Sequence, residues 1–218
     1  MRCAFVAVAM FLVSLAVGQQ PPADDSTAKE ASEGFVRLFD GKSLDGWQGD
    51  VANYRVEDGL LVCHGTNLYT AKPYANFVLR FEFRLPPAGN NGIGIRTPMR
   101  VDAAYHGMEI QILDDGHPSY KGLQPYQAHG SIYGVAAAKR GLLKPQGEWN
   151  REEIIADGSH IKVTLNGVVI TDADLSKITK TVDGREHPGL HNAKGFIGLL
   201  GHGNDPVAFR NLRLKELP

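Results

Sequence analysis

The chain is 218 residues long, and its 23 lysines and arginines balance 24 aspartates and glutamates, so that the formal net charge at pH 7 is −1. The basic residues are scattered and form no stripe, which argues against a nucleic acid or an anionic membrane surface as partner. A chain of this size can bury one good hydrophobic core, so we expect a single domain.

The N-terminal segment predicts export. A positively charged start precedes an apolar run from Ala4 to Val17 that ends in small residues. This run is shorter than the ~20 residues of a membrane-spanning helix, so we interpret residues 1–18 as a signal peptide. We therefore expect a periplasmic or secreted protein whose mature chain does not insert into the membrane. Residues 19–33 lack large apolar side chains and are expected to form a flexible tether.

Short strands separated by glycine turns follow along the rest of the chain, residues 34–218. The turns Asp58-Gly59 and Asn166-Gly167 are hairpin signals, and no stretch predicts a long helix. Cys63 lies in an apolar strand and has no other mature-chain cysteine to pair with, so we expect a small buried hydrophobe. This pattern predicts an all-β sandwich or jelly roll. The expected strands are 34–39, 54–57, 60–63, 76–85, 93–96, 108–113, 131–135, 151–156, 161–165, 168–170, 194–200 and 207–217.

The strand around Glu109 carries the greatest density of reactive side chains. Three apolar residues alternate there with Glu109 and Gln111, so the carboxyl and the amide project from the same face. His106 precedes this strand, and Asp114 and His117 follow it. We therefore expect the strand to form the floor of a functional site.

Four parts of the chain form a recognisable combination: 35–47, 89–93 with Arg96, 107–114, and the closing stretch 194–199, 202–203 and 209–211. Together they resemble the 3-keto-disaccharide (3-keto-glycoside) hydrolase domain family, and the resemblance extends over nearly the whole mature chain. It implies a concanavalin- or laminin-G-like jelly roll of two antiparallel sheets, and the cleavage of a small carbohydrate already oxidised to a ketone at sugar C3.

With this resemblance, Glu109 is the first candidate for a catalytic base or a metal ligand. Arg96 is expected on the same face, where it could stabilise an enolate or form an ordinary ion pair with Glu109. His129 ends a long polar segment, 116–129, of a kind that is often functional, and is the third catalytic candidate. The candidate substrate-binding residues are Gln111, Asp114, His106, Tyr133, His202 and Trp47.

Several of these residues also have a structural interpretation. Asp114 could cap a turn, and Trp47 could pack in the core. Glu109, Asp114 and His117 are ligand types for Ca²⁺ or a transition metal, but they do not follow a metal-binding spacing, so a divalent cofactor remains an open alternative.

Three classes of function agree with the sequence. The first is an enzyme that cleaves 3-keto-glycosides by enolate-type elimination and hydration or by hydrolysis, and the second is a non-catalytic glycan-binding jelly-roll module. The third, a conventional glycosidase, needs a second carboxylate roughly 5–9 Å from Glu109. Gln111 stands where that carboxylate would be simplest to place, which argues against the third class.

Overall fold

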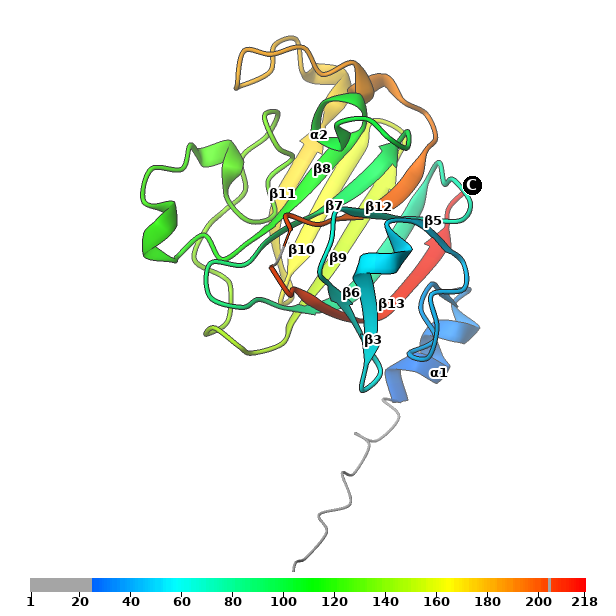
Figure 1. Cartoon of the computed structure of the whole chain (residues 1–218). Coiled ribbons are helices and arrows are strands. Elements are labelled where there is room, and N and C mark those ends of the chain that lie inside the picture. Colours follow the sequence, from blue (N-terminus) through cyan, green and yellow to red (C-terminus); the bar gives the residue numbers. More distant parts are fainter. Residues whose placement is uncertain (1–24, 204) are drawn as a thin grey trace, which may run out of the picture.

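A computed structural model describes residues 25–203 and 205–218. The expected signal peptide, residues 1–18, lies outside the described residues, as does the first part of the expected tether. Within the described part, two antiparallel β-sheets pack face to face (Figure 1). The prediction of an all-β jelly-roll sandwich is therefore confirmed.

The larger sheet, sheet A, has the strand order β11-β10-β9-β6-β13-β4-β3, and β1 also pairs with β13. The smaller sheet, sheet B, has the order β2-β5-β12-β7-β8. The strands of sheet A are β1 (Val36–Arg37), β3 (Tyr54–Glu57), β4 (Leu60–Cys63), β6 (Phe77–Arg84), β9 (Asn150–Asp157), β10 (His160–Leu165), β11 (Val168–Asp174) and β13 (Ala208–Glu216). Those of sheet B are β2 (Trp47–Gly49), β5 (Asn67–Thr70), β7 (Asn90–Thr97), β8 (Met108–Leu113) and β12 (Phe196–Leu200).

The helical segments of the described part are short and lie outside the sheets. They are α1 (Asp25–Ser32), α2 (Ala103–His106), and the 3₁₀ turns η1 (Val51–Asn53), η2 (Pro118–Tyr120), η3 (Pro125–Gln127), η4 (Leu175–Lys177) and η5 (Pro188–His191). None of the helices in residues 25–203 and 205–218 has the length and apolar character needed to span a bilayer.

Alternating apolar residues form the core between the sheets. Burying one such side chain completely stabilises the fold by about 1.5–3 kcal/mol. Trp47 belongs to this core, where its indole Nε1 donates to the Leu38 carbonyl (2.8 Å), and Cys63 is buried there as a free thiol. The contributions of β6 and β8, each at most 1% exposed, are Phe77, Leu79, Phe81, Phe83, Met108, Ile110 and Ile112.

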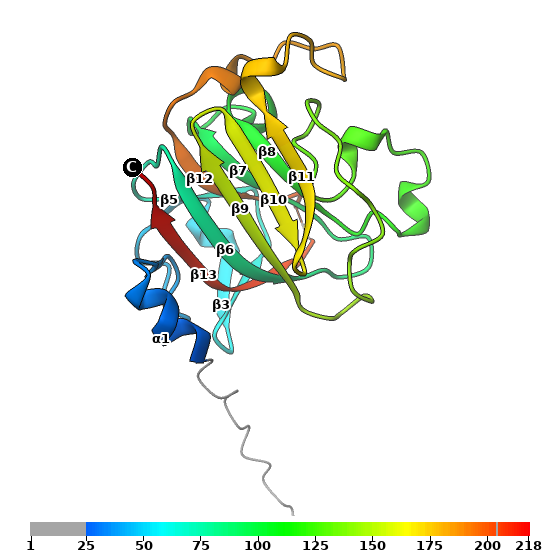
Figure 2. The same ribbon diagram turned by 180° about the vertical axis from the view of Figure 1, so that it is seen from behind.

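Helix α1 lies in the stretch that was expected to be a flexible tether, so that prediction is wrong for residues 25–32. The helix lies beside β13 (Figure 2). Its Glu30 side chain is buried and accepts hydrogen bonds from Arg213, through Nε and through Nη2 (3.0 Å), and from Arg80 Nη1 (2.9 Å). Charge pairing with the sheet therefore holds a helix that offers no large apolar side chain.

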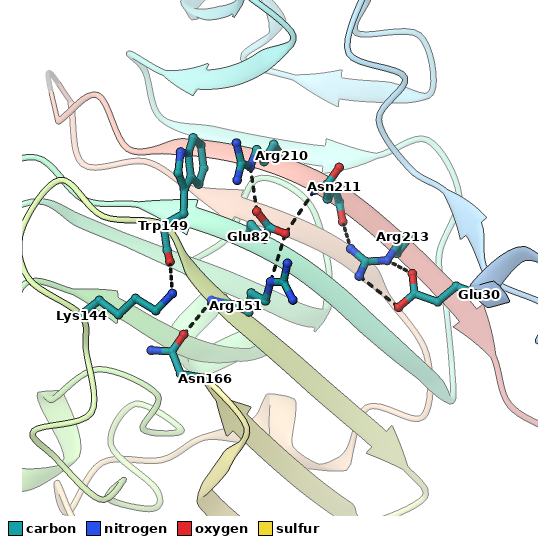
Figure 3. A network of polar contacts seen from close by, with 9 residues as sticks. All are labelled: Glu30, Glu82, Lys144, Trp149, Arg151, Asn166, Arg210, Asn211 and Arg213. Carbon is teal, nitrogen blue, oxygen red and sulfur yellow. Dashed lines mark hydrogen bonds and ion pairs between the residues drawn. The ribbon is translucent and has the colours of Figure 1, made fainter. Parts of the chain in front are cut away.

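The outer face of sheet A is occupied by contacts among its own side chains. Glu82 accepts from Arg210 Nε (2.7 Å) and Asn211 Nδ2 (3.2 Å) and pairs with Arg151 (3.4 Å), as Figure 3 shows. The guanidinium of Arg210 lies 4.0 Å from the centre of the Trp149 ring. The polar residues singled out on the strand around Glu109 belong instead to sheet B.

Candidate active site

The floor of the candidate site is the outer face of β7 and β8. Their register sets Glu109 opposite Gly94 and Gln111 opposite Gly92. A Cβ placed on Gly92 would lie only 2.8 Å from Cγ and Cδ of Glu109 and nearer still to its Oε1. The glutamate side chain therefore lies across Gly92, in space that only a glycine leaves free.

Glu109 is a buried carboxyl, 7% exposed. Burial, followed by the nearby charge of Asp102, raises the pKa of Glu109 from 4.5 to about 8. In the amide orientation that satisfies both of its ends, Gln111 donates to Glu109 Oε1 (3.2 Å) and to the Asn91 carbonyl (3.1 Å). This hydrogen bond fixes the position of the carboxyl. A carboxyl of this kind exchanges a proton near neutral pH.

A cavity of about 410 Å³ opens above this floor. Its walls come from the α2 segment, the 114–133 segment, the 181–187 loop and the residues after β12. Hydroxyl, amide and carboxyl groups together with aromatic rings are the groups that bind sugars in such cavities. The lining residues are Asn90, Asp102, Ala104, Tyr105, Glu109, Gln111, Leu113, Tyr120, Leu123, Gln127, Tyr133, Arg185 and His202.

A second hollow, of about 460 Å³, lies between the end of β6 and residues 146–147 and 206. Arg84 is the one titratable side chain among its described lining residues, and most of the others are proline, glycine or leucine. It is slightly larger than the cavity above Glu109, but it offers no group for proton transfer beside a carboxyl. The smaller cavity is therefore the candidate active site.

The α2 wall is held by packing against sheet B and by a cap at the N-terminus of the helix. Ala103 packs with Tyr69 and Leu200 on the outer face of sheet B. The Asp102 carboxylate caps the helix by accepting from Ala104 N (3.1 Å). These contacts hold Asp102 and Tyr105 at the rim of the cavity.

The 181–187 loop closes against Tyr105. Arg185 Nη1 donates to the Tyr105 hydroxyl (2.5 Å), and the Tyr105 ring packs on His187 at 4.7 Å between ring centres. His187 is buried between the Ala104 carbonyl (3.1 Å) and the Asp183 carboxylate (3.0 Å). The loop is thus tied to α2 by hydrogen bonds and ring packing together.

The 114–133 segment extends the sheet past β8. Gly130 N donates to the Gln111 carbonyl (2.7 Å), and Tyr133 N donates to the Glu109 carbonyl (2.9 Å). The Tyr133 hydroxyl in turn accepts from Gln127 Nε2 (3.1 Å). The wall that carries Tyr120, Gln127 and Tyr133 is therefore joined by backbone hydrogen bonds to β8, the strand that carries Glu109.

Four of the residues predicted for the site line the cavity together: Glu109, Gln111, Tyr133 and His202. Trp47 does not line it, because it is part of the core between the sheets.

Arg96 is not the same-face neighbour of Glu109, so that geometric prediction is wrong. The pairing of β12 with β7 changes register there, and Arg96 has a φ of +48°. Its guanidinium donates to the carbonyls of Ala75 (2.8 Å) and Gly158 (2.7 Å) and to Asn76 Oδ1 (3.1 Å). The bulge thereby directs Arg96 to a structural role in joining loops of the two sheets.

His129 lies inside the sandwich and does not line the cavity. It is 3% exposed, its Nδ1 accepts from Leu113 N (3.3 Å), and its Nε2 lies 3.0 Å from Oε2 of the buried Glu152. Its ring also packs on Phe83 at 5.2 Å between ring centres. His129 therefore anchors the end of the 116–129 segment to sheet A.

The remaining candidates lie at the ends of the loops. Asp114 accepts from Ala88 N (3.1 Å) and so binds the loop before β7, His117 Nδ1 accepts from Ser119 N (3.2 Å) and caps the turn η2, and His106 is exposed. Over residues 25–203 and 205–218, no three His, Cys, Asp or Glu side chains gather as ligands for one metal ion. Glu109, Asp114 and His117 are thus not brought together.

Sequence reasoning missed most of the walls. Tyr120 and Gln127 lie in the long polar segment that was flagged as a whole, but no signal distinguished them from their neighbours. Arg185 and Tyr105 are 80 residues apart, and their hydrogen bond links two loops that carry no motif. Asp102 could have been recognised as a helix cap, but its place beside Glu109 depends on the packing of α2.

Comparisons with known proteins identify the family of the chain. The model of the family described as 3-keto-alpha-glucoside-1,2-lyase-like domain matches residues 34–215. A 3-keto-disaccharide hydrolase from Bacteroides thetaiotaomicron is 28% identical over 235 residues, which cover 85% of this chain and 79% of that protein.

Solved structures show the same likeness. A crystal structure from Parabacteroides distasonis, described as a proposed glycosyl hydrolase, has a TM-score of 0.76 at 33% identity and covers 84% of this chain and 99% of that one. A second from the same organism, described in the same way, has a TM-score of 0.75 at 26% identity and covers 87% and 97%. A Bacillus subtilis protein with a galectin-like fold, with a TM-score of 0.52 at 12% identity over 78% of this chain and 89% of that one, shares the fold alone.

Proposed function

This chain belongs to the family of 3-keto-alpha-glucoside-1,2-lyase-like domains, and on that premise we propose that it is an enzyme that cleaves glycosides whose sugar carries a ketone at C3. The observation that carries the proposal is the buried Glu109 carboxyl, which is held by Gln111 on the floor of a cavity lined with polar and aromatic groups.

The ketone changes which bond is easiest to break. A carbonyl at C3 acidifies the hydrogen on C2, because the electron pair left after deprotonation spreads into an enolate. When the carbonyl re-forms, C1 and C2 become doubly bonded and the bond from C1 to the glycosidic oxygen breaks. The departing oxygen takes up a proton. Water then adds across C1 and C2, with hydroxyl on C1 and hydrogen on C2, so that the overall reaction is hydrolysis.

This route needs one group that removes a proton, one that supplies a proton and donors for the enolate oxygen. With its pKa raised to about 8, Glu109 is suited to proton transfer near neutral pH. Proton transfer by such a positioned group typically contributes 10²–10⁴-fold to a rate. Gln127 and Arg185 supply donors on the walls that suit sugar hydroxyls and a carbonyl oxygen.

One observation favours a second candidate function. Asp102 is another carboxylate on the cavity wall, and its charge contributes to the raised pKa of Glu109. A conventional glycosidase, which acts on unoxidised sugars, uses two carboxyl groups as its catalytic residues. However, Asp102 caps α2 and is exposed, so we favour the reaction assisted by the ketone.

The experiment compares a 3-keto-glucoside with its parent glucoside and follows release of the aglycone. We expect release from the 3-keto compound only, and a loss of about 10²-fold or more in E109Q for an unactivated leaving group. The matched control is E148Q, because Glu148 is an exposed carboxyl outside the cavity.

Each departure from this result has a distinct meaning. Binding of the sugar without release by the wild-type protein would support a glycan-binding module, and release from the parent glucoside would support a conventional glycosidase. A fully active E109Q would refute the role of Glu109.

A further inference from the structure

His202 stands on the cavity wall across β7 from the Glu109 strand. In sheet B, β7 lies between β12 and β8, and Gly94 faces Gly198 on one side and Glu109 on the other. On this face β7 presents Gly92 and Gly94 beside the Glu109 strand, and Asn90, at the start of β7, lines the cavity together with Glu109 and His202. Glu109 and His202 therefore reach the same cavity from opposite sides of β7, Glu109 from β8 and His202 from the segment after β12.

The backbone before His202 is held tightly. Gly201 N donates to the Thr66 carbonyl (2.9 Å), and a Cβ on Gly201 would lie 2.5 Å from that carbonyl oxygen and 2.6 Å from Cys63 Sγ. Only glycine fits at position 201, and the next residue, His202, lines the cavity. His202 is thus placed by its backbone, and its imidazole has no hydrogen-bond partner among residues 25–203 and 205–218.

The other titratable groups of the wall are already engaged by the protein. Asp102 accepts from Ala104 N, and Tyr105 accepts from Arg185. Tyr120 donates to the Ala88 carbonyl (2.9 Å), and Tyr133 accepts from Gln127. Glu109 has an amide donor but no cationic partner in the part of the chain that the structure describes. Glu109 and His202 are therefore the groups best placed to exchange a proton with a bound molecule.

We propose that His202 is the catalytic base that removes the C2 proton and that Glu109 is the acid that protonates the departing glycosidic oxygen. This assignment rests on the proposed function and divides its two proton transfers. The C2–H bond breaks, its proton goes to the imidazole, and the electron pair enters the enolate. The C1–O bond then breaks as the leaving oxygen takes the Glu109 proton. Water next adds to C1 and gives its proton to the Glu109 carboxylate, while the His202 imidazolium returns its proton to C2, so that both groups regain their starting protonation states.

The protonation states near neutral pH agree with this division. Desolvation lowers the pKa of His202, against the opposing charges of Asp205 and Asp102, although the residue as a whole remains exposed. A neutral imidazole is the form that accepts a proton. Burial raises the pKa of Glu109 to about 8, so this carboxyl holds a proton to give.

Two measurements separate the roles. The first uses 1,5-anhydro-3-ketoglucitol, which has no glycosidic leaving group on C1, and follows hydrogen–deuterium exchange at C2 by NMR in D₂O. We expect H202Q to lose about 10²-fold or more of the exchange rate and E109Q to stay within a few-fold of wild type. The control is H191Q, because His191 is exposed and does not line the cavity.

The second measurement compares methyl and nitrophenyl 3-ketoglucosides, because a nitrophenolate leaves without help from an acid. E109Q should lose about 10²-fold on the methyl compound and less than about 10-fold on the nitrophenyl compound. H202Q should lose equally on both. If wild type cleaves but H202Q exchanges C2 at the wild-type rate, or if E109Q alone abolishes exchange, the assignment is overturned. If wild type neither cleaves nor exchanges, the proposed function itself has failed.

Discussion

Replacement of Gly92 by alanine tests whether the position of the Glu109 carboxyl controls the reaction. The added methyl would lie 2.8 Å from Cδ of Glu109, whereas ordinary contacts begin at 3.4 Å, so the carboxyl carbon must move by at least 0.6 Å and Oε1 by more. Gly92 does not have a positive φ, so its backbone accepts alanine and the sheet should form. A misplacement near 1 Å costs a reaction about 10²-fold. We expect G92A to fold and to lose activity on this scale.

The assay is kcat/KM on a 3-keto-glucoside, with thermal unfolding as a check of the fold. G116A is the matched control, because a Cβ on Gly116 meets nothing within 4 Å and its φ is not positive. G94A adds a methyl that is crowded but does not touch the carboxyl, since it would lie 3.2 Å from Leu200 Cδ2 and Thr97 Cγ2. Its loss of activity should therefore fall between those of G116A and G92A. Wild-type activity in a folded G92A would refute the reasoning, because the carboxyl would then have moved without consequence.

Two further predictions concern stability. Since the pKa of Glu109 rises from 4.5 to about 8 on folding, the native state binds its proton more tightly, and stability is lost as pH rises through that range. E109Q should therefore be more stable than wild type at pH 9, by on the order of 5 kcal/mol at ~1.4 kcal/mol per pKa unit, with the advantage gone at pH 4 in urea titrations; equal stabilities at pH 9 would contradict it. Burial raises the pKa of Glu30, but Arg213 and Arg80 outweigh it and lower the pKa, so its contribution is present at neutral pH and lost as pH falls through the folded pKa. E30Q should cost about 1–3 kcal/mol at pH 7 and less at pH 3, and the same loss at both pH values would argue against the charge pairing.

The alternation of apolar and polar residues along one strand predicted the floor of the site, because β8 alone provides both of its polar side chains. Glu109 and Gln111 share one face of β8 because that strand has no bulge and three apolar neighbours fix its other face in the core. The same counting failed for Arg96, where a register shift and a positive φ redirect the side chain. A bulge has no sequence signal in this stretch, so the error could not be seen from the alternation.

The other misses come from partners that are distant in the sequence. In the sequence His129 ends a polar segment, and its partner Glu152 stands 23 positions later, on β9, where the two buried side chains lie 3.0 Å apart. Helix α1 has no apolar stripe, and its stability depends on Arg80 and Arg213 in strands far along the chain. Both cases involve charges whose partners are set by tertiary packing, which local pattern does not encode.

The glycines of sheet B explain why the cavity forms on this sheet. Glycine inside a strand is unfavourable by roughly 0.5–1 kcal/mol, so Gly92, Gly94 and Gly198 need a reason to stand there. A Cβ on Gly198 would lie 2.9 Å from the Tyr69 ring, and one on Gly94 would lie 3.2 Å from Leu200, so two of them make room for the apolar cluster that anchors α2. The third, Gly92, makes room for a carboxyl alone. A position where an unfavourable residue, here a glycine inside a strand, is kept to accommodate one reactive group is where function is expected. On sheet A, by contrast, the outer face is filled by ion pairs among its own side chains.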